Sequence, residues 1–205
     1  GVLSSGTNGI VVNAAAADVV VLQGLDIQGA GTGLNGIRFL AGGALHVENC
    51  YIGGFIQKGI DFEPTVAAQL FVIDTVIVNN AAAAGGAIFV KPGVGGSAIG
   101  SIDNVRMERN HFGVHIEGAV TMAVRNSVAT ANTTHGFNAL NTSAARGLML
   151  ERVSSFANGL AGVRSDGAGT VVRITDSTIF GNSNGMQVNV GTIDSIGNNG
   201  NVGNT

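Results

Sequence analysis

The sequence predicts an all-β protein, a parallel β-solenoid of about seven to eight coils, each with about 25 residues and three short strands. Two observations support this prediction. A glycine followed by a short apolar segment recurs along the chain at nearly equal intervals. A second marker, an Asn or Asp between two apolar segments, recurs in phase with the first. Repeats of this length are typical of solenoids, in which each coil buries its apolar face against its neighbours.

The first strand of each coil follows the marker glycine. Apolar residues alternate there with more variable ones, which is the period-two pattern of a strand with one buried face. The marker glycines are Gly9, Gly36, Gly59, Gly86, Gly113, Gly136, Gly162 and Gly185. The segment before each glycine varies in length, as expected for a surface loop that tolerates insertions.

The second and third strands of a coil meet at a corner. Val47, Cys50 and Ile52 can all point inward only if the chain turns between residues 48 and 50, because side chains alternate along a strand. Asn, Asp and Gly tolerate the left-handed backbone that such a corner requires. The predicted Asn and Asp corners are Asn49, Asp74, Asn104, Asn126 and Asp176, with Gly24 in the first copy and Arg152 as the one poor fit.

A further Asn follows six residues after the corner, at the end of the third strand. Because the same side chain recurs at the same point of each coil, we expect the amides to stack in a column and to bond the backbone of the turns. This predicted column consists of Asn80, Asn110, Asn132, Asn158 and Asn182.

The composition excludes several other classes of protein. The chain has 33 Gly among 205 residues, 45% hydrophobic residues, and 23 charged residues (10 basic and 13 acidic) with a net charge of -3. Disordered chains have fewer apolar residues and a larger net charge. The balanced charge predicts no nucleic-acid partner, and no apolar run reaches the ~18 residues of a membrane span. The single Cys50 excludes an internal disulfide framework.

The order of these markers resembles the right-handed parallel β-helix of the pectin-lyase-like fold. The resemblance covers residues 9 to about 190, and the segments 5–9 and 32–37 are similar to uncharacterised exported bacterial β-helix proteins. It implies a single domain over 1–205 that lacks its native N-terminal cap or signal region, in an exported extracellular or cell-surface protein. It leaves the activity open, because lyases, hydrolases, epimerases, tailspikes and adhesins share this fold.

The resemblance also implies that a saccharide would lie on the outer face of the strand that follows the marker glycine. The first outward position there reads Arg38, Asp61, Ile88, His115, Asn138, Arg164 and Gln187. The second reads Leu40, Glu63, Val90 or Lys91, Glu117, Leu140 and Asp166. Arg and Asn can bond hydroxyl and carboxylate groups. The polar members of the first row are therefore candidate glycan contacts, although a solvated sheet face would show the same pattern.

No catalytic residue is predicted. Glycoside hydrolysis needs two carboxyl groups about 5–9.5 Å apart, and we expect no coil or neighbouring pair of coils to supply two outward acids on this strip. Three histidines, His111, His115 and His135, could approach one metal ion with Glu117 nearby. Exposed or turn-capping histidines explain the same spacing, so we predict no metal and no cofactor.

Apolar side chains at outward positions of the other two faces indicate lateral packing against another molecule. They are Val21, Phe71, Met149, Val76 and Val128. Stacked coils also leave unpaired strands at both ends, which indicates end-to-end contact. The leading hypothesis is a non-catalytic structural or adhesive solenoid that self-associates and contacts glycans. The alternative is a polysaccharide lyase, glycoside hydrolase or uronan epimerase.

Overall fold

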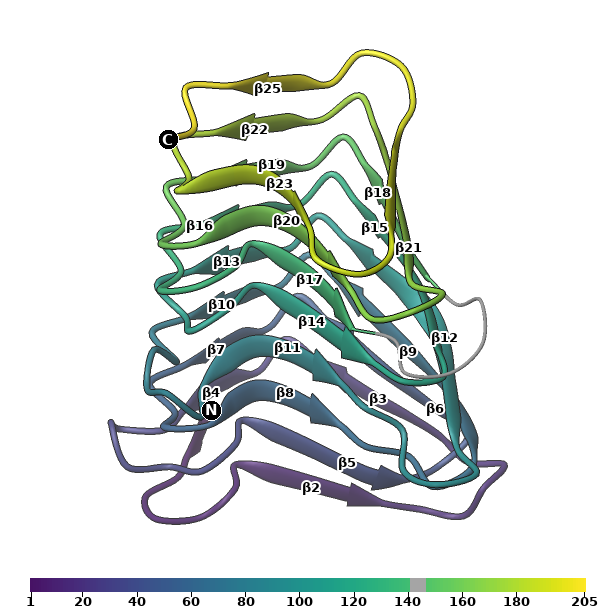
Figure 1. The fold of residues 1–205 in the computed structure, drawn as a ribbon. Helices are drawn as coiled ribbons and strands as arrows, with labels where there is room; N and C mark the ends of the chain where they lie inside the picture. Colours follow the sequence, from purple (N-terminus) through teal and green to yellow (C-terminus); the bar gives the residue numbers. More distant parts are fainter. Residues whose placement is uncertain (141–146) are drawn as a thin grey trace.

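The computed structural model describes residues 1–140 and 147–205, which form a parallel β-solenoid of about eight turns (Figure 1). Each turn contributes one strand to each of three sheets, here called A, B and C. Strands three apart in the chain lie side by side, and their pairing is parallel throughout the described residues. Equivalent positions of successive turns are about 25 residues apart, so the predicted three-strand β-solenoid is confirmed. Within the described ranges, no helix is long and apolar enough to cross a membrane.

The strands of the three sheets follow one another along each turn in the order B, C, A. Sheet A contains β1 (Val2–Leu3), β4 (Asp26–Gln28), β7 (Tyr51–Gly53), β10 (Val76–Val78), β13 (Arg106–Glu108), β16 (Val128–Thr130), β19 (Ser154–Phe156), β22 (Thr178–Phe180) and β25 (Gly200–Val202). Sheet B contains β2 (Ile10–Asn13), β5 (Ile37–Ala41), β8 (Lys58–Phe62), β11 (Gly86–Val90), β14 (Val114–Glu117), β17 (Phe137–Leu140), β20 (Ala161–Asp166) and β23 (Asn184–Val188). Sheet C contains β3 (Val19–Gln23), β6 (Ala44–Glu48), β9 (Ala67–Ile73), β12 (Ser97–Asp103), β15 (Val120–Arg125), β18 (Gly147–Glu151), β21 (Val171–Thr175) and β24 (Thr192–Ser195).

The core is a column of apolar side chains enclosed by the three sheets. Ile37, Ile60 and Ile88 occupy equivalent inward positions of sheet B and are fully buried. The rings of Phe39 and Phe62 stack at 4.3 Å between centroids in neighbouring turns. Each such side chain stabilises the fold by about 1.5–3 kcal/mol through burial. The regular turn-to-turn contact fixes the register of sheet B, and with it the outward side chains described below.

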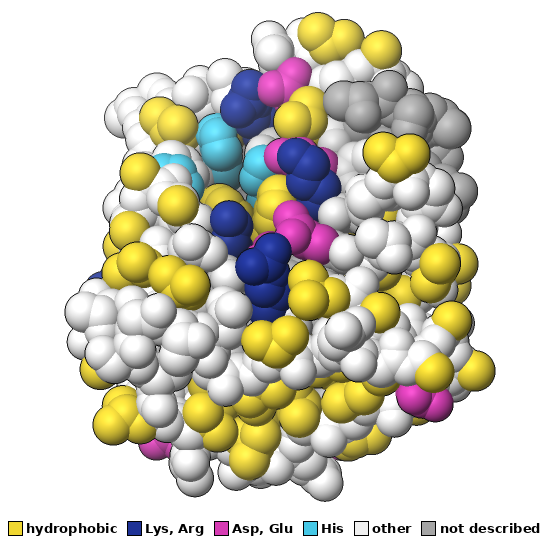
Figure 2. Space-filling model, turned by 90° about the horizontal axis from the view of Figure 1, so that it is seen from below, with side chains coloured by type: hydrophobic (Ala, Val, Ile, Leu, Met, Phe, Trp, Pro, Cys, Tyr) yellow, Lys and Arg dark blue, Asp and Glu magenta, His cyan; other side chains and the backbone are white. Residues whose placement is uncertain are grey.

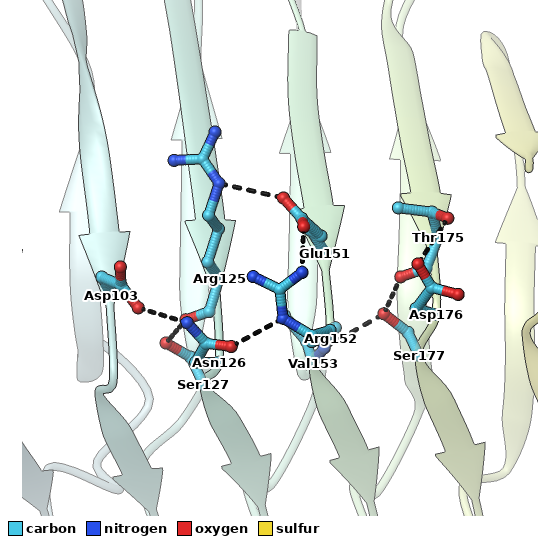
Figure 3. Close-up of polar contacts among 10 residues, drawn as sticks. All are labelled: Asp103, Arg125, Asn126, Ser127, Glu151, Arg152, Val153, Thr175, Asp176 and Ser177. Atoms are coloured by element: carbon cyan, nitrogen blue, oxygen red, sulfur yellow. Dashed lines mark hydrogen bonds and ion pairs between the residues drawn. The ribbon is translucent and has the colours of Figure 1, made fainter.

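The corners between sheets C and A adopt left-handed backbone. Their φ angles are 50° at Asn49, 49° at Asp74, 52° at Asn104, 48° at Asn126 and 50° at Asp176. The corner side chains also bond along the stack. Asn104 Nδ2 donates to Asp74 Oδ1 at 2.6 Å, and Asn126 Nδ2 donates to Asp103 Oδ1 at 2.8 Å (Figure 3). These residues therefore supply both the backbone conformation and the lateral polar contacts of the corner.

Arg152 occupies the same corner position with a φ of 51°. Unlike Asn and Asp, Arg does not have the short polar side chain that favours left-handed backbone. Its Nε donates to Asn126 Oδ1 at 2.9 Å, so the guanidinium continues the polar chain that the other turns build from amides (Figure 3). It also pairs with Glu151. Left-handed backbone costs a non-Gly residue about 1–2 kcal/mol, and Asn less than most.

Arg152→Asn is expected to raise the free energy of unfolding by about 0.5–1 kcal/mol. The amide can replace the Nε bond to Asn126, while the exposed ion pair that is lost contributes little. Urea denaturation of the two proteins measures the difference. Arg109→Asn makes the same change at a left-handed position (φ of 51°) on the other side of sheet A. A similar gain is expected there, because Arg109 Nε bonds Asn79 in the same way as Arg152 Nε bonds Asn126. A loss of stability in both variants would contradict the explanation.

A second corner, between sheets A and B, was not predicted as left-handed. Asn79, Arg109, Ala131 and Ala157 have φ angles from 51° to 61° at this point. Each immediately precedes an Asn of the buried column. The side chain of that Asn forms hydrogen bonds with backbone groups of the turn that have no backbone partner. The sequence signal is weak because Ala and Arg are not typical of left-handed positions.

The Asn column runs through the interior of these second corners. The Oδ1 atom of each Asn accepts bonds from the preceding turn; for example, Asn158 Oδ1 accepts from Asn132 N at 3.2 Å and from Asn132 Nδ2 at 2.9 Å. The column extends beyond the five predicted members, because Asn204 Oδ1 accepts from Asn182 N at 3.0 Å. At its other end, Asn80 Oδ1 accepts from Phe55 N at 2.9 Å. Backbone donors at these turns are thereby satisfied without water.

Candidate functional site

One row of outward side chains crosses sheet B from turn to turn. The register places Arg38 beside Asp61, His115 beside Asn138, and Asn138 beside Arg164. Gln187 follows Arg164 in the same row and is half-buried. The structure thus aligns all six predicted glycan-contact candidates in one row.

Ile88 does not belong to this row, contrary to the expectation from the marker glycines. It pairs with Ile60 and Val114 and is fully buried, whereas Phe89 pairs with Asp61 and with His115. In this turn the marker glycine, Gly86, lies one register position earlier than the marker glycines of the neighbouring turns. Ala87, and not Gly86, therefore lies beside Gly59. Period-two alternation through 87–90, with Ile88 and Val90 inward, would have revealed the offset. For the same reason Lys91, and not the buried Val90, carries the second outward position.

Five buried side-chain polar atoms in the described residues lack a hydrogen-bond partner, and all five belong to this row. They are Arg38 Nε, Asp61 Oδ1, His115 Nε2, Asn138 Oδ1 and Arg164 Nε. Leaving a buried donor or acceptor unpaired costs about 1–3 kcal/mol. Elsewhere the described fold satisfies its buried side-chain polar atoms, so the row is where the protein retains unused hydrogen-bonding capacity. Two of these atoms are donors and two are acceptors, and His115 Nε2 donates or accepts according to its tautomer.

The row lies in a groove on the outer face of sheet B. Figure 2 shows basic, acidic and histidine side chains gathered in one column on this face, with hydrophobic side chains among them. A cleft of about 340 Å³ opens along its central turns. It is lined by Lys58, Ala83, Ala84, Gly85, Phe89, His111, Phe112, His115, Glu117, Thr134, His135, Asn138 and Arg164.

Ion pairs engage several of the charged side chains. Lys91 Nζ lies 2.6 Å from Glu117 Oε2 on the neighbouring strand, and Glu117 Oε1 also lies 3.4 Å from the imidazole Nε2 of His115 on its own strand. Arg164 pairs with Asp166. Lys58 makes no ion pair with any residue that the structure describes, and its Nζ lies 5.1 Å from the centre of the Phe89 ring. The cleft therefore presents one cation without an acidic partner.

Asp61 and Glu63 point outward from the same strand end, so the expectation that no coil supplies two outward acids is wrong. Arg38 lies between them: its Nε is 3.8 Å from Asp61 Oδ2, and its Nη2 is 3.6 Å from Glu63 Oε2. Burial, reinforced by the negative charge of Glu63, raises the pKa of Asp61 to about 6. A carboxyl group in this position holds a proton closer to neutral pH than an exposed aspartate does.

Two of the cleft histidines are held neutral by their surroundings. Burial lowers the pKa of His115 to about 4, against the opposing effect of Glu117. Burial and then the positive charge of Arg164 lower the pKa of His135 to about 4. Burial also lowers the pKa of His111. These three lie around the cleft, yet no group of three or more His, Cys, Asp or Glu side chains in the described residues converges to hold a metal ion.

Sequence reasoning missed Lys58, Phe89 and Phe112 as parts of this cleft. Lys58 and Phe112 share one feature with His135: each stands directly before a marker glycine. Lys58 is the first residue of β8, whereas Phe112 and His135 lie two residues before β14 and β17. The sequence pattern alone assigns that position to a variable loop. Phe112 also packs over the backbone of Gly86, where an added Cβ would come within 2.2 Å of its Cζ.

A second, more apolar groove of about 610 Å³ lies on the outer face of sheet C. Phe71 and Met149, two of the predicted outward apolar residues, line it together with the exposed Ile99. Val21 is exposed on the same sheet, while Val76 and Val128 are half-buried on sheet A. The predicted apolar residues therefore occupy two faces of the solenoid.

The fold and this polar groove define the chain as a parallel β-solenoid with a candidate ligand-binding strip on one sheet. Comparison with known protein families, with curated proteins and with solved structures found no match. The function of the chain is therefore inferred from the groove itself.

Proposed function

We propose that the chain is a non-catalytic saccharide-binding solenoid with an adhesive or structural role, in which sugar residues lie along the row Arg38–Asp61–Phe89–His115–Asn138–Arg164. The unpaired buried atoms of this row are the observation that supports it most. A saccharide carries hydroxyl groups that both donate and accept, so one ligand can form hydrogen bonds with the side chains of Asn138 and Arg164 together. The row of successive strands also offers equivalent positions at the strand spacing of about 4.8 Å.

The resemblance to exported bacterial β-helix proteins of the pectin-lyase-like fold is consistent with this role. It supports a location outside the cell or on its surface, where polysaccharides are available. Three of the four histidines of the chain and the charged side chains of Lys58, Glu117 and Arg164 line the cleft. We propose no cofactor, nucleic-acid partner or membrane span for this function.

A glycan array followed by calorimetry on the best ligand tests the proposal. Asn138→Ala removes a buried acceptor from the row and is expected to weaken binding about tenfold, the equivalent of one hydrogen bond to a ligand. Arg173→Ala changes an exposed residue on sheet C and is expected to leave the affinity unchanged. Absence of saccharide binding at millimolar concentrations, or equal effects of the two substitutions, would contradict the proposal.

Asp61 and Glu63 favour a second candidate function, a glycan-cleaving or epimerising enzyme. A carboxyl group with a raised pKa can act as the acid of such reactions, with a second carboxyl group nearby. Asp61 would hold the proton, since its pKa is about 6. Turnover of the bound glycan by the wild-type protein, lost in Asp61→Asn and retained in Asp194→Asn on sheet C, would establish this function in place of simple binding.

Self-association is a third property that we propose, with a second copy of the chain as the partner. Apolar side chains are exposed on the outer faces of the terminal turns: Leu3, Val11, Val19 and Val21 at one end and Phe180, Val188 and Val202 at the other. The described edge strands β1, β2 and β3 pair on one side only. End-to-end stacking of two copies would pair these strands and place the exposed apolar side chains of the two ends next to one another. Negative-stain microscopy of a dilution series tests this, with end-to-end chains expected and dispersed single rods at every concentration contradicting it.

A further inference from the structure

His135 faces a hydrogen-bond donor at each of its two ring nitrogens. The side chain is buried, with 8% of its surface exposed. Its Nδ1 lies 3.2 Å from the backbone nitrogen of Ala161, which donates to it. Its Nε2 lies 3.3 Å from Arg164 Nη1. A neutral imidazole has one acceptor nitrogen and one N–H group, and a guanidinium has donors only. One of these two contacts must therefore bring two donors together.

The backbone contact decides which nitrogen carries the proton. Ala161 is fully buried, and leaving its N–H group unpaired would cost about 1–3 kcal/mol. Nδ1 is therefore the acceptor, and the proton resides on Nε2, which faces Arg164. The pKa of about 4 keeps the ring in this neutral form at neutral pH. The result is a pair of N–H groups, from His135 and Arg164, that meet without an acceptor between them.

The remaining groups of Arg164 leave it available to a ligand. Only its Nη2 is engaged by a carboxylate, that of Asp166, while its Nε is buried and unpaired. Lys58 lines the same cleft from β8, four strands away from Arg164 on β20, and adds positive charge to the cleft as a whole. The donors available at this end of the cleft are therefore those of Arg164 and His135.

We propose that His135 and Arg164 form an oxyanion subsite, in which a carboxylate or sulfate oxygen of an acidic saccharide accepts hydrogen bonds from His135 Nε2–H and Arg164 Nη1–H. An anionic oxygen removes the conflict between the two donors and adds a charge-assisted bond to the guanidinium. This inference rests on the proposed saccharide binding and deepens it, because it assigns the sugar a negative charge and fixes where that charge lies.

The first test compares probes that share a glucopyranose ring and differ in charge on the wild-type protein. Methyl glucuronide, methyl glucoside and glucose 6-sulfate are titrated by calorimetry. At least tenfold tighter binding of one acidic probe than of the glucoside is expected, and the tighter of the two acids identifies carboxylate or sulfate as the group. Equal binding of all three overturns the oxyanion subsite while leaving saccharide binding intact. Binding of none contradicts the proposed function instead.

The second test reads the His135 ring directly and needs no substitution. Nitrogen NMR of the histidine side chains is expected to show His135 neutral with its proton on Nε2, and sodium sulfate or acetate is expected to shift that Nε2 signal. A proton on Nδ1, or signals unmoved by both anions, overturns the subsite even if saccharides bind.

The matched variants separate charge recognition from folding. Arg164→Gln keeps a polar side chain in the row and is expected to reduce the preference for the acidic probe to less than threefold, with the glucoside still bound. Arg125→Gln on sheet C is the control, for which the preference should be unchanged. Retention of the full preference in Arg164→Gln would contradict the assignment.

Discussion

Asn158→Ala is expected to lower the free energy of unfolding by about 3–4 kcal/mol. Asn158 is 2% exposed, and its Nδ2 lies within bonding distance of Ala129 O, Ser155 Oγ and Asn182 Oδ1 at 2.9–3.1 Å. Its Oδ1 satisfies the backbone N–H of Asn132. The substitution leaves several buried polar groups unpaired at once, each at a cost of about 1–3 kcal/mol when no water replaces the amide.

Urea denaturation monitored by circular dichroism measures this loss. Asn198→Ala is the matched control, because Asn198 is exposed and its side chain reaches Asp176 only at 3.5 Å. A change below about 0.5 kcal/mol is expected for it. Equal stabilities of the two variants would show that water satisfies the column and that the Asn side chains are dispensable.

Acidification is expected to act on His135 and Asp61 with opposite signs. The folded state lowers the pKa of His135 from 6.5 to about 4. Between these values it binds fewer protons than the unfolded state, so stability falls as the pH falls. The folded state raises the pKa of Asp61 from 3.8 to about 6, so this group binds more protons when folded and its destabilising effect disappears as the pH falls. Each shift corresponds to roughly 3 kcal/mol over its range.

Unfolding free energies of His135→Gln and Asp61→Asn at pH 7 and pH 4 check both signs. Relative to the wild type, His135→Gln should gain about 3 kcal/mol in going from pH 7 to pH 4, and Asp61→Asn should lose about 2–3 kcal/mol. His46→Gln, on the outer face of sheet C, is the control. The groups that face His135 are Arg164, His115, His111 and Asp166, and those that face Asp61 are Glu63, Lys58 and Arg38. Parallel pH profiles of all four proteins would contradict the assignment.

The architecture could be predicted from the sequence because solenoid coils repeat their constraints. A corner in left-handed backbone selects Asn, Asp or Gly, and a buried turn selects an Asn that can bond backbone on both sides. Each constraint appears several times, so a single exception such as Arg152 does not obscure the pattern. The second corner was not predicted, because residues such as Ala131 adopt its left-handed backbone. Ala is not a residue type that indicates left-handed backbone.

The groove was harder to predict for a different physical reason. The period-two alternation of apolar residues predicted which side chains of sheet B point outward. It predicted that Arg38, His115 and Arg164 lie in one row. The walls of the cleft come from connecting segments, whose lengths vary and whose side chains follow no period. Phe112 lies in such a segment and Lys58 begins β8 directly after one, and the one-residue offset at Ala87 exchanged Ile88 for Phe89. The proton states of Asp61 and His135 depend on burial, which is a property of the assembled turns.

Hydroxyl side chains at the corners between sheets C and A recur at every second turn. Thr75, Ser127 and Ser177 follow their corner residues, and the oxygen of each accepts the backbone N–H of the residue at the same place one turn earlier, Cys50, Val105 and Val153 respectively. Those three residues of the intervening turns carry no hydroxyl group, so corners with and without a hydroxyl alternate over the six turns from Cys50 to Ser177. The alternation does not extend to the turn before them, which has Leu25 at this place.

The structural unit that can be copied or excised without a mismatch is therefore a pair of turns. Excision of a single turn would bring two hydroxyl-bearing corners, or two without a hydroxyl, into contact. Excision of two turns would restore the alternation. A protein of this kind would be expected to lengthen during evolution by duplication of two turns at a time, and shortened or extended forms designed in steps of two turns should fold more stably than those designed in steps of one.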